Sequence, residues 1–312
     1  MKIRRHENQL DINSPSKVNL TLELLEKRAD GFHELETVMT TINLCDRIRF
    51  TPRDDSKLSL KLHTGFDAIP DQDEIPVDER NLIIKALQLV RQSAGIDRGM
   101  SVGLLKRIPS QAGLGGASGN AAAALIAANE LWKLNWSLEK LQSLGAELGS
   151  DVPFFLTGGA AICRGRGEKI TPVLCPSRFW LVIAKPPVGL STAKVYQEAR
   201  VPDESLSSDP ILSAMASADS SSVGHFMFNR LEHFAASLSP WIVQLQKIFQ
   251  QLNCQGHQLS GSGTSYFGIF ANFKSASLAA KYLSNRLPMV KIFTSHTLSR
   301  VAQSDPFHAL AG

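Results

Sequence analysis

Apolar and polar residues alternate along the first part of the chain. In residues 18–24 every second position is valine or leucine and the positions between them are polar, which predicts a strand with one buried face. The turn-forming sequence Ala29-Asp30-Gly31 follows, and further strand-like runs occupy 36–50 and 57–63. We therefore expect the early part of the chain to be mostly sheet.

Helical periodicity takes over in the middle of the chain. Residues 82–94 carry one apolar stripe, with Asn81 placed to cap the start of a helix and Gly95 to end it. A strand over 100–106 is expected to lead into a glycine-rich segment and then a helix to about residue 132. Residues 138–148 predict another helix, between Ser137 and Gly149.

The second half of the sequence mixes short helices and strands. We expect a hairpin over 158–172, a strand over 179–184, helices over 228–238, 241–252 and 275–286, and a last strand over 290–294. Residues 200–223 are rich in Ser, Asp and Ala, which predicts an exposed connection with at most a short helix at 211–216. Because the elements follow no strict βαβ rhythm, the predicted fold class is α+β.

Length and composition narrow the function classes. The 312 residues predict two domains, and 43% hydrophobic against 20% charged residues is enough to build a buried core. The net charge of +4 comes without a basic run, so we expect no nucleic-acid partner. No apolar run reaches the roughly 20 residues that cross a bilayer, and no secretory signal is evident. We expect no membrane association and no obligate protein partner.

Cysteine and histidine usage agrees with this picture. The four cysteines lie far apart without a CxxC pair, and the eight histidines form no HExxH pattern. These features favour a reduced, cytoplasmic location and indicate no protein ligand set for a metal ion.

The segment 108–124, IPSQAGLGGASGNAAAA, is the strongest candidate for a ligand site. Its glycines allow backbone N–H groups to approach an anion, and the alanine-rich run predicts a helix whose N-terminus adds free donors. It is neither a Walker A sequence nor a dinucleotide fingerprint. Glycine-rich turns before helices are common, so this segment alone leaves both a phosphate site and an ordinary turn open.

Three further features carry candidate chemistry. Lys17, in SPSKVNL at the entry of the first long strand, could stabilise an anion, although most single lysines are solvated. Asp151, in GSDVPF, is either a turn former or a buried acid that accepts a hydroxyl proton during phosphoryl transfer. The loop Ser260-Gly261-Ser262-Gly263-Thr264 offers donors to an anion but is also typical of hairpin turns.

Taken in this order, the Pro-x-Lys, Gly-Leu-Gly-Gly and Gly-Ser-Gly motifs resemble the galactokinase, homoserine kinase, mevalonate kinase and phosphomevalonate kinase superfamily. Within it the chain is similar to the 4-diphosphocytidyl-2-C-methyl-D-erythritol kinase family of the non-mevalonate isoprenoid pathway. The segments that carry this similarity are SPSKVNL at 14–20, RADGFHELETV at 28–38, ERNLIIKA at 79–86, GLGGASGNAA at 113–122, GSDVPFF at 149–155 and LSGSGTSYF at 259–267. The resemblance is weakest over 200–280.

The resemblance implies a two-lobed α+β kinase fold with the active site in the cleft between the lobes. The N-terminal nucleotide-binding lobe, of the ribosomal-protein-S5-domain-2 type, would span 1–172. The C-terminal substrate-binding lobe, ferredoxin-like, would span 173–312. The last strand is free to return to the first lobe in this arrangement.

The family's activity implies that the chain phosphorylates the 2-hydroxyl of diphosphocytidyl methylerythritol with ATP. Asp151 would accept the hydroxyl proton, Lys17 would stabilise Asp151 and the transferred phosphoryl group, and Mg²⁺ would screen the polyphosphate. The residues implied to bind ATP are Asn81, Lys106, Pro109, Gly113, Leu114, Gly115, Gly116, Ala117, Ser118, Gly119 and Asn120.

A second set of residues is implied to bind the substrate. Phe32 would stack on cytosine, His33 would hydrogen-bond its edge, and Tyr196 would close the sandwich. The full set is Asn19, Phe32, His33, Thr192, Tyr196, Gly261, Ser262 and Gly263. Without the resemblance, core packing is the ordinary interpretation of Phe32 and Tyr196, and a surface role that of His33.

Some positions depart from the family pattern. Phe32 replaces the commoner Tyr and so lacks its hydroxyl, whereas Ala117 and Gly119 stand where Gly and Ser are common. The serine-rich segment 200–223 is interpreted as an insertion.

Two other functions stay open at this level. One is a kinase of the same superfamily that acts on homoserine or a mevalonate derivative. The other is a non-catalytic sensor that binds ligand and ATP. The presence of both Lys17 and Asp151 disfavours the sensor.

Overall fold

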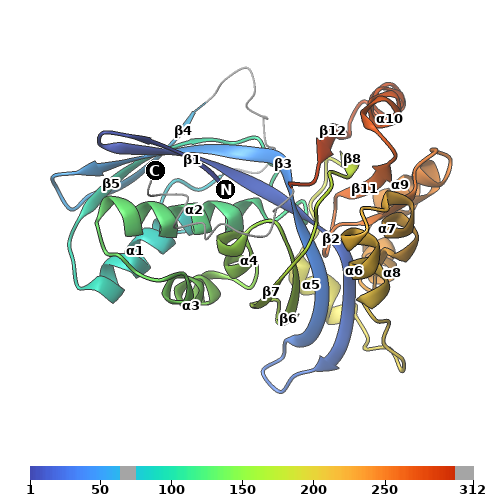
Figure 1. Ribbon diagram of the computed structural model, residues 1–312, viewed down its shortest axis with the longest axis horizontal. Coiled ribbons are helices and arrows are strands. Elements are labelled where there is room, and N and C mark those ends of the chain that lie inside the picture. Colours follow the sequence, from blue (N-terminus) through green and yellow to red (C-terminus); the bar gives the residue numbers. More distant parts are fainter. Residues whose placement is uncertain (64–74, 299–312) are drawn as a thin grey trace. The chain divides into compact units, whose positions relative to one another are not determined.

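The fold contains two long strands, β2 (Gln9–Lys27) and β3 (His33–Arg53), which are joined by a short turn. They are hydrogen-bonded neighbours in an eight-stranded sheet (Figure 1). The computed structural model describes residues 1–63 and 75–298. The chain is divided into two compact units, and β2 and β3 each have residues in both units.

Unit 1 comprises residues 1–16, 44–110 and 115–156, and unit 2 comprises 17–43, 111–114 and the described residues from 157 onward. The lobes expected at 1–172 and 173–312 stay a prediction, and residues 299–312 lie outside the described residues.

Unit 1 is a sheet with helices on one face, as Figure 1 shows. Strand β1 (Lys2–His6) pairs antiparallel with β2, β5 (Gly99–Leu105) pairs antiparallel with β3, and β4 (Leu58–His63) runs parallel to β5. The helices are α1 (Leu82–Ala94), α2 (Gly116–Leu131), α3 (Leu138–Leu148) and α4 (Val152–Thr157).

Local signals set the bounds of α1 and α3 as predicted, whereas the short helix α4 was not predicted. The Asn81 side chain accepts a hydrogen bond from the N–H of Ile83 at the start of α1, and Gly95 ends the helix with φ 64°. Ser137 caps α3 through the N–H of Lys140. Helix α2 is buried from Gly119 to Asn129, because its run of alanines lets neighbouring elements approach closely.

Unit 2 contains a four-stranded antiparallel sheet in the order β10 (Gly256–Leu259), β11 (Tyr266–Phe270), β8 (Trp180–Lys185), β12 (Lys291–His296). The hairpin of β6 (Ala160–Gly165) and β7 (Lys169–Val173) extends β3, and the short β9 (Phe228–Asn229) runs parallel to β2. The helices are α5 (Thr192–Glu198), α6 (Asp209–Ala216), α7 (Ser220–Phe226), α8 (Glu232–Leu238), α9 (Pro240–Gln250) and α10 (Phe273–Arg286).

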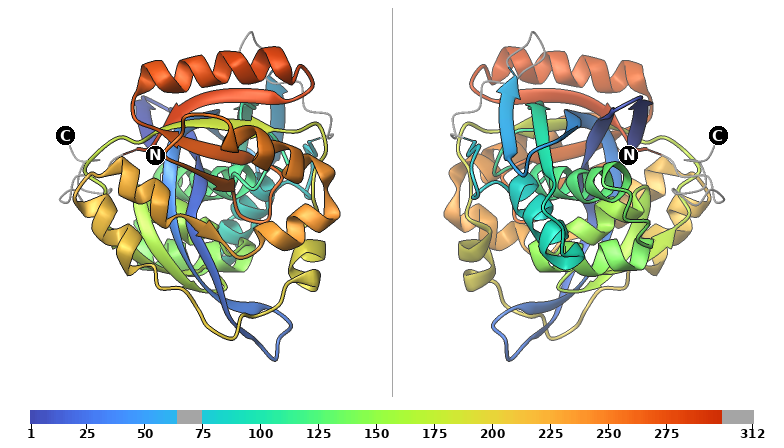
Figure 2. Two further views of the ribbon diagram at one scale, coloured as in Figure 1. Left: turned by 90° about the vertical axis from the view of Figure 1, so that its right-hand side faces the viewer. Right: turned by 90° about the vertical axis from the view of Figure 1, so that its left-hand side faces the viewer.

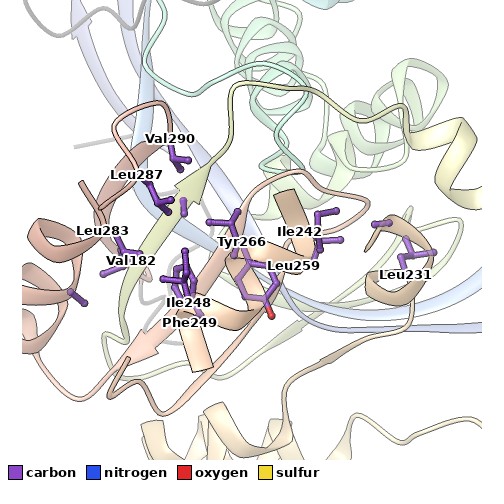
Figure 3. Close-up of a cluster of buried hydrophobic side chains, with 14 of the residues drawn as sticks. Val182, Leu231, Ile242, Ile248, Phe249, Leu259, Tyr266, Leu283, Leu287 and Val290 are labelled. Atoms are coloured by element: carbon purple, nitrogen blue, oxygen red, sulfur yellow. The ribbon is translucent and has the colours of Figure 1, made fainter. Parts of the chain in front are cut away.

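The core of unit 2 lies between this sheet and helices α9 and α10. Phe249 and Leu283 from the two helices meet Val182 and Tyr266 from β8 and β11, all fully buried (Figure 3). Figure 2 shows α10, near the red end of the colour scale, lying along β12. Among the described residues no helix is both long and apolar enough to span a bilayer.

The structure corrects three of the expectations for single elements. The strand at 18–24 has both faces buried, since Asn19, Thr21 and Glu23 are at most 3% exposed. The connection at 200–223 holds two helices, α6 and part of α7, and is anchored by the buried Ser208. The helix expected from residue 228 begins only at 232, because Phe228 and Asn229 form β9. Each difference arises from contacts distant in sequence.

Candidate active site

The first glycine-rich loop ends in an uncapped helix. Gln111, Gly113 and Gly115 have positive φ angles, and α2 begins directly after Gly115 with no side chain bonded to its first N–H groups. Free N–H groups at the start of a 16-residue helix favour a bound anion. Two buried polar atoms at this end, Ser14 Oγ and Asn120 Oδ1, have no hydrogen-bond partner within the described chain. The free N–H groups and the Ser14 hydroxyl can donate to a polyphosphate ligand, whereas the Asn120 amide oxygen can only accept a hydrogen bond.

Gly119 has a steric reason to lack a side chain. A Cβ atom there would lie 2.8 Å from Ser14 Oγ and 2.9 Å from the carbonyl oxygen of Pro15. The departure from the commoner serine at this position therefore agrees with the local packing of unit 1.

A buried carboxylate that the sequence analysis did not identify binds groups just before α2 and within it. Asp46, in β3, is fully buried and lies 2.9 Å from the ammonium group of Lys106. Its carboxylate also accepts hydrogen bonds from the N–H groups of Arg107 and Ile108 and from the Asn120 amide, at 2.7 to 2.8 Å. The segment INLCDRIRF carries two arginines as well as Asp46, so nothing in the local sequence distinguishes this carboxylate.

The other predicted nucleotide residues of unit 1 are placed as follows. The Asn81 amide caps α1 and donates to the carbonyl of Pro76 at 2.7 Å, so its side chain has a structural role whatever it binds. Pro109 is buried. Residues Gly116, Ala117 and Ser118 form the first turn of α2.

Asp151 lies in unit 1, in the turn directly before α4. Lys17 belongs to unit 2. Their pairing stays a prediction.

In unit 2, Lys17 and Asn19 share one face of β2. Lys17 is 4% exposed and donates to Asn19 Oδ1 at 2.6 Å, and the Asn19 amide donates to Thr37 Oγ1 at 2.8 Å. The second glycine-rich loop approaches both. A Cβ on Gly261 would lie 3.2 Å from Lys17 Nζ and 3.3 Å from Asn19 Oδ1, and the residue has φ 58°. The structure thus brings three predicted site residues together.

The two glycine-rich loops also meet within unit 2. Ser260 Oγ donates to the carbonyl of Gly113 at 3.0 Å, and a Cβ on Gly113 would overlap the Ser260 carbonyl oxygen. Leu114 accepts a hydrogen bond from the backbone N–H of Lys17 at 2.9 Å. Ser262 shares a 2.8 Å hydroxyl hydrogen bond with Thr192, which starts α5. Lys17, residues 113–114, Thr192 and the 260–264 loop therefore form one continuous set of contacts.

The predicted pyrimidine-reading residues lie in the same unit. The His33 and Tyr196 rings are 5.6 Å apart, and His33 is 6% exposed. Burial lowers the pKa of His33, with the charge of Lys27 as a second cause, so the imidazole is neutral at pH 7 and offers one donor and one acceptor. The Phe32 ring is 52% exposed and lies 5.0 Å from the Arg166 guanidinium.

No group of three or more metal-ligating side chains occurs within residues 1–63 and 75–298.

Comparison with known proteins identifies the family. Residues 81–159 match the GHMP kinases N terminal domain, and residues 211–288 match GHMP kinases C terminal. The 4-diphosphocytidyl-2-C-methyl-D-erythritol kinase of Shouchella clausii (strain KSM-K16) is 38% identical over 259 residues, 83% of this chain and 84% of that protein. The enzyme of the same name from Alkaliphilus metalliredigens (strain QYMF) is 37% identical over 88% of this chain and 93% of its own length.

Solved structures agree with this assignment. A crystal structure of 4-(cytidine 5'-diphospho)-2C-methyl-D-erythritol kinase has a TM-score of 0.75 and 30% identity, covering 93% of this chain and all of that one. The mevalonate kinase of L. major in complex with R-mevalonate shares the fold, with a TM-score of 0.70 at 20% identity. The chain therefore belongs to the 4-diphosphocytidyl-2-C-methyl-D-erythritol kinase family of the GHMP kinases.

Proposed function

We propose that the chain transfers the γ-phosphoryl group of ATP to the 2-hydroxyl of 4-diphosphocytidyl-2-C-methyl-D-erythritol. The observation that carries this choice is the His33 and Tyr196 ring pair, in the same unit as Lys17 and the 260–264 loop. A neutral imidazole beside an aromatic ring suits the edge and face of a pyrimidine. Homoserine and mevalonate present no such ring, so a kinase for them has no use for the pair.

ATP binding would draw on groups of unit 1 at the start of α2 and just before it. The free N–H groups at the start of α2 hold phosphate oxygens, with Ser118 and Asn120 as the nearest side chains. Lys106 adds a positive charge beside Gly116, whose Cβ position lies 3.3 Å from its ammonium nitrogen. Mg²⁺, bound to the polyphosphate, screens its charge and supports the transfer.

The remaining residues act on the acceptor. Asp151 takes the proton of the substrate 2-hydroxyl as the hydroxyl oxygen bonds to the γ-phosphorus. At the same time the bond between the γ-phosphorus and the bridging oxygen breaks, and ADP leaves with that oxygen. Lys17 stabilises the negative charge on the phosphoryl oxygens. Backbone and hydroxyl donors of Gly261, Ser262, Gly263 and Thr192 bind the diphosphate of the substrate. The four free cysteines suit a reduced compartment, and we assign the activity to the cytoplasm.

The test is a coupled assay of ADP formation with three alcohols: the diphosphocytidyl substrate, homoserine and mevalonate. Turnover of the first alone is expected. Turnover of another alcohol, or binding of ATP and ligand without any turnover, would overturn the assignment. Asp151→Asn is expected to lower kcat by about 10²- to 10⁴-fold while leaving the affinity for the diphosphocytidyl substrate nearly unchanged. Full activity of this variant would exclude Asp151 as the base.

A further inference from the structure

The last residue of β9, Asn229, binds the second glycine-rich loop through its side chain. The amide nitrogen of Asn229 donates to two carbonyl oxygens of the loop, Leu259 at 2.9 Å and Gly261 at 2.8 Å. The amide oxygen of the same side chain accepts from the N–H of Leu231 at 3.0 Å. Both N–H donors of the Asn229 amide and one acceptor position on its oxygen therefore bond to backbone groups.

Asn229 is itself held against the strand that carries Lys17 and Asn19. Strand β9 pairs in parallel with β2, with Asn229 opposite Leu22, and the N–H of Arg230 donates to the Leu22 carbonyl at 2.9 Å. The Arg230 guanidinium forms a bidentate pair with Glu23 at 2.8 and 2.7 Å, and Glu23 is fully buried. The Asn229 side chain thus links a fixed point on β2 to the loop.

Because the peptide group is planar, this link also determines the direction of a backbone N–H donor. In a trans peptide the carbonyl of one residue and the N–H of the next point in opposite directions. The bond from Asn229 fixes the Gly261 carbonyl, and therefore also fixes where the Ser262 N–H points. No acceptor for that N–H is found in the described part of the chain, whereas the N–H groups of Ser260 and Gly263 are bonded within the loop.

Gly261 backs onto the charged part of the site. A Cβ added to Gly261 would lie 3.2 Å from Lys17 Nζ and 3.3 Å from Asn19 Oδ1, so the backbone of the loop passes close to both side chains. Gly261 has φ 58°, and because it lacks a Cβ its backbone has more orientations open to it than that of a bulkier residue. An external constraint is needed to select one of them.

We infer that Asn229 is a positioning residue that orients the Gly261–Ser262 peptide so that the Ser262 N–H serves as a donor to the diphosphate of the substrate. The inference rests on the proposed function, and it adds a residue that makes no contact with the substrate itself.

Two substitutions separate this role from a purely structural one. Asn229→Ala removes every side-chain hydrogen bond. Asn229→Asp keeps an acceptor for the Leu231 N–H but places a carboxylate oxygen against two carbonyl oxygens. If the loop contacts matter, the aspartate variant is impaired at least as much as the alanine variant. If only the bond to Leu231 matters, the aspartate variant resembles the wild type.

The measurement is calorimetric binding of CDP and of cytidine, together with the kinetics of the diphosphocytidyl substrate. Loss of two hydrogen bonds and of the N–H orientation is expected to weaken CDP binding by about tenfold or more and to leave cytidine binding within about twofold. KM for the diphosphocytidyl substrate is expected to rise in proportion, with KM for ATP little changed. A loosened unit 2 would instead weaken both ligands equally, and that result would overturn the inference.

Asn272→Ala is the matched control. Asn272 caps α10 in the same unit through the Ser275 N–H at 2.9 Å, and its substitution removes that one hydrogen bond to a backbone group without touching the loop. This variant is expected to bind CDP like the wild type. If wild-type protein neither binds CDP nor phosphorylates the diphosphocytidyl alcohol, the proposed function itself fails. If wild type does both and Asn229→Ala and Asn229→Asp match it, only the role of Asn229 is wrong.

Discussion

The carboxylate of Asp46 and the ammonium group of Lys106 lie 2.9 Å apart, with Asp46 fully buried and Lys106 only 12% exposed at its side chain. Asp46 also binds the Asn120 amide in α2, so one carboxylate holds two residues that we assign to ATP. A buried pair of this kind is costly to break, because the remaining partner keeps its charge or its donors without compensation. Through Lys106 and Asn120, Asp46 therefore joins β3 to the segment after β5 and to α2.

Asp46→Asn tests this relationship. The substitution keeps the size of the side chain but removes the charge that compensates Lys106 and turns one oxygen into a donor facing other donors. We expect the free energy of unfolding to fall by about 3 kcal/mol and KM for ATP to rise more than KM for the alcohol. Urea unfolding and steady-state kinetics measure the two effects.

Asp11→Asn provides the matched control for that variant. Asp11 pairs with Arg49 at 2.7 Å in the same unit, but the Arg49 side chain is 59% exposed. Loss of an exposed pair is expected to cost less than about 1 kcal/mol and to leave both KM values unchanged. Equal losses in the two variants would show that burial of Asp46 has no special consequence.

Gly119→Ala tests the close packing at the start of α2. The added methyl group would lie 2.8 Å from Ser14 Oγ and 2.9 Å from a backbone oxygen, so we expect a loss of about 1 to 3 kcal/mol. Combining it with Ser14→Ala removes one of the two close contacts and is expected to restore part of the loss. Thermal unfolding of the single and double variants measures this coupling.

Gly149→Ala is the comparison for Gly119→Ala. A Cβ at Gly149 would have its nearest neighbour, Val152 Cγ2, at 3.8 Å, and the residue has an extended backbone. Little change in stability is expected there. A similar cost at both positions would attribute the effect to the backbone of glycine and not to crowding.

Helix bounds were predictable because their signals are local. The caps of α1 and α3 lie within four residues of the groups that they bind, and both predictions are confirmed. The buried polar face of residues 18–24 was not predictable in this way. Glu23 is buried because Arg230, 207 residues later in the chain, pairs with it. Alternation alone assigns such a residue to solvent.

The residues of the candidate site also separate into those that the sequence predicted and those that only the structure revealed. Motif resemblance selected Lys17, Asn19 and Gly261, and the structure brings these three together in unit 2. It gave no sign of Asp46 or Asn229, which act on motif residues and not as part of a motif. Asp46 lies 74 residues from Asn120, and Asn229 lies 32 residues from Gly261. Supporting residues of this kind are recognised only when the fold places them.

Phe32 allows a test of the exposed aromatic position. Its ring faces the Arg166 guanidinium at 5.0 Å and is 52% exposed, so it contributes little to folding but is available to a ligand. Phe32→Tyr keeps the ring and is expected to keep KM for the diphosphocytidyl substrate within about twofold. Phe32→Ala removes the stacking surface and is expected to raise that KM by about fivefold or more with unchanged stability. Equal KM values for all three proteins would exclude Phe32 from the pyrimidine site.

Because of His33, the free energy of unfolding and the affinity for the pyrimidine ligand are both expected to fall as the pH decreases. Burial, reinforced by Lys27, lowers the folded-state pKa of His33 below its ordinary value of 6.5. Between those two pKa values the unfolded chain binds a proton that the folded chain does not, so the contribution of His33 to stability is full above pH 6.5 and is lost as the pH falls toward the folded pKa.

Titration of the imidazole by NMR should show the lowered pKa directly. Lys27→Gln removes the second cause and is expected to raise that pKa partway toward 6.5. Because only the neutral imidazole has an acceptor for the cytosine edge, CDP affinity should fall in acid at a higher pH in this variant than in the wild type. A His33 pKa at or above 6.5 in the folded protein would remove both expectations.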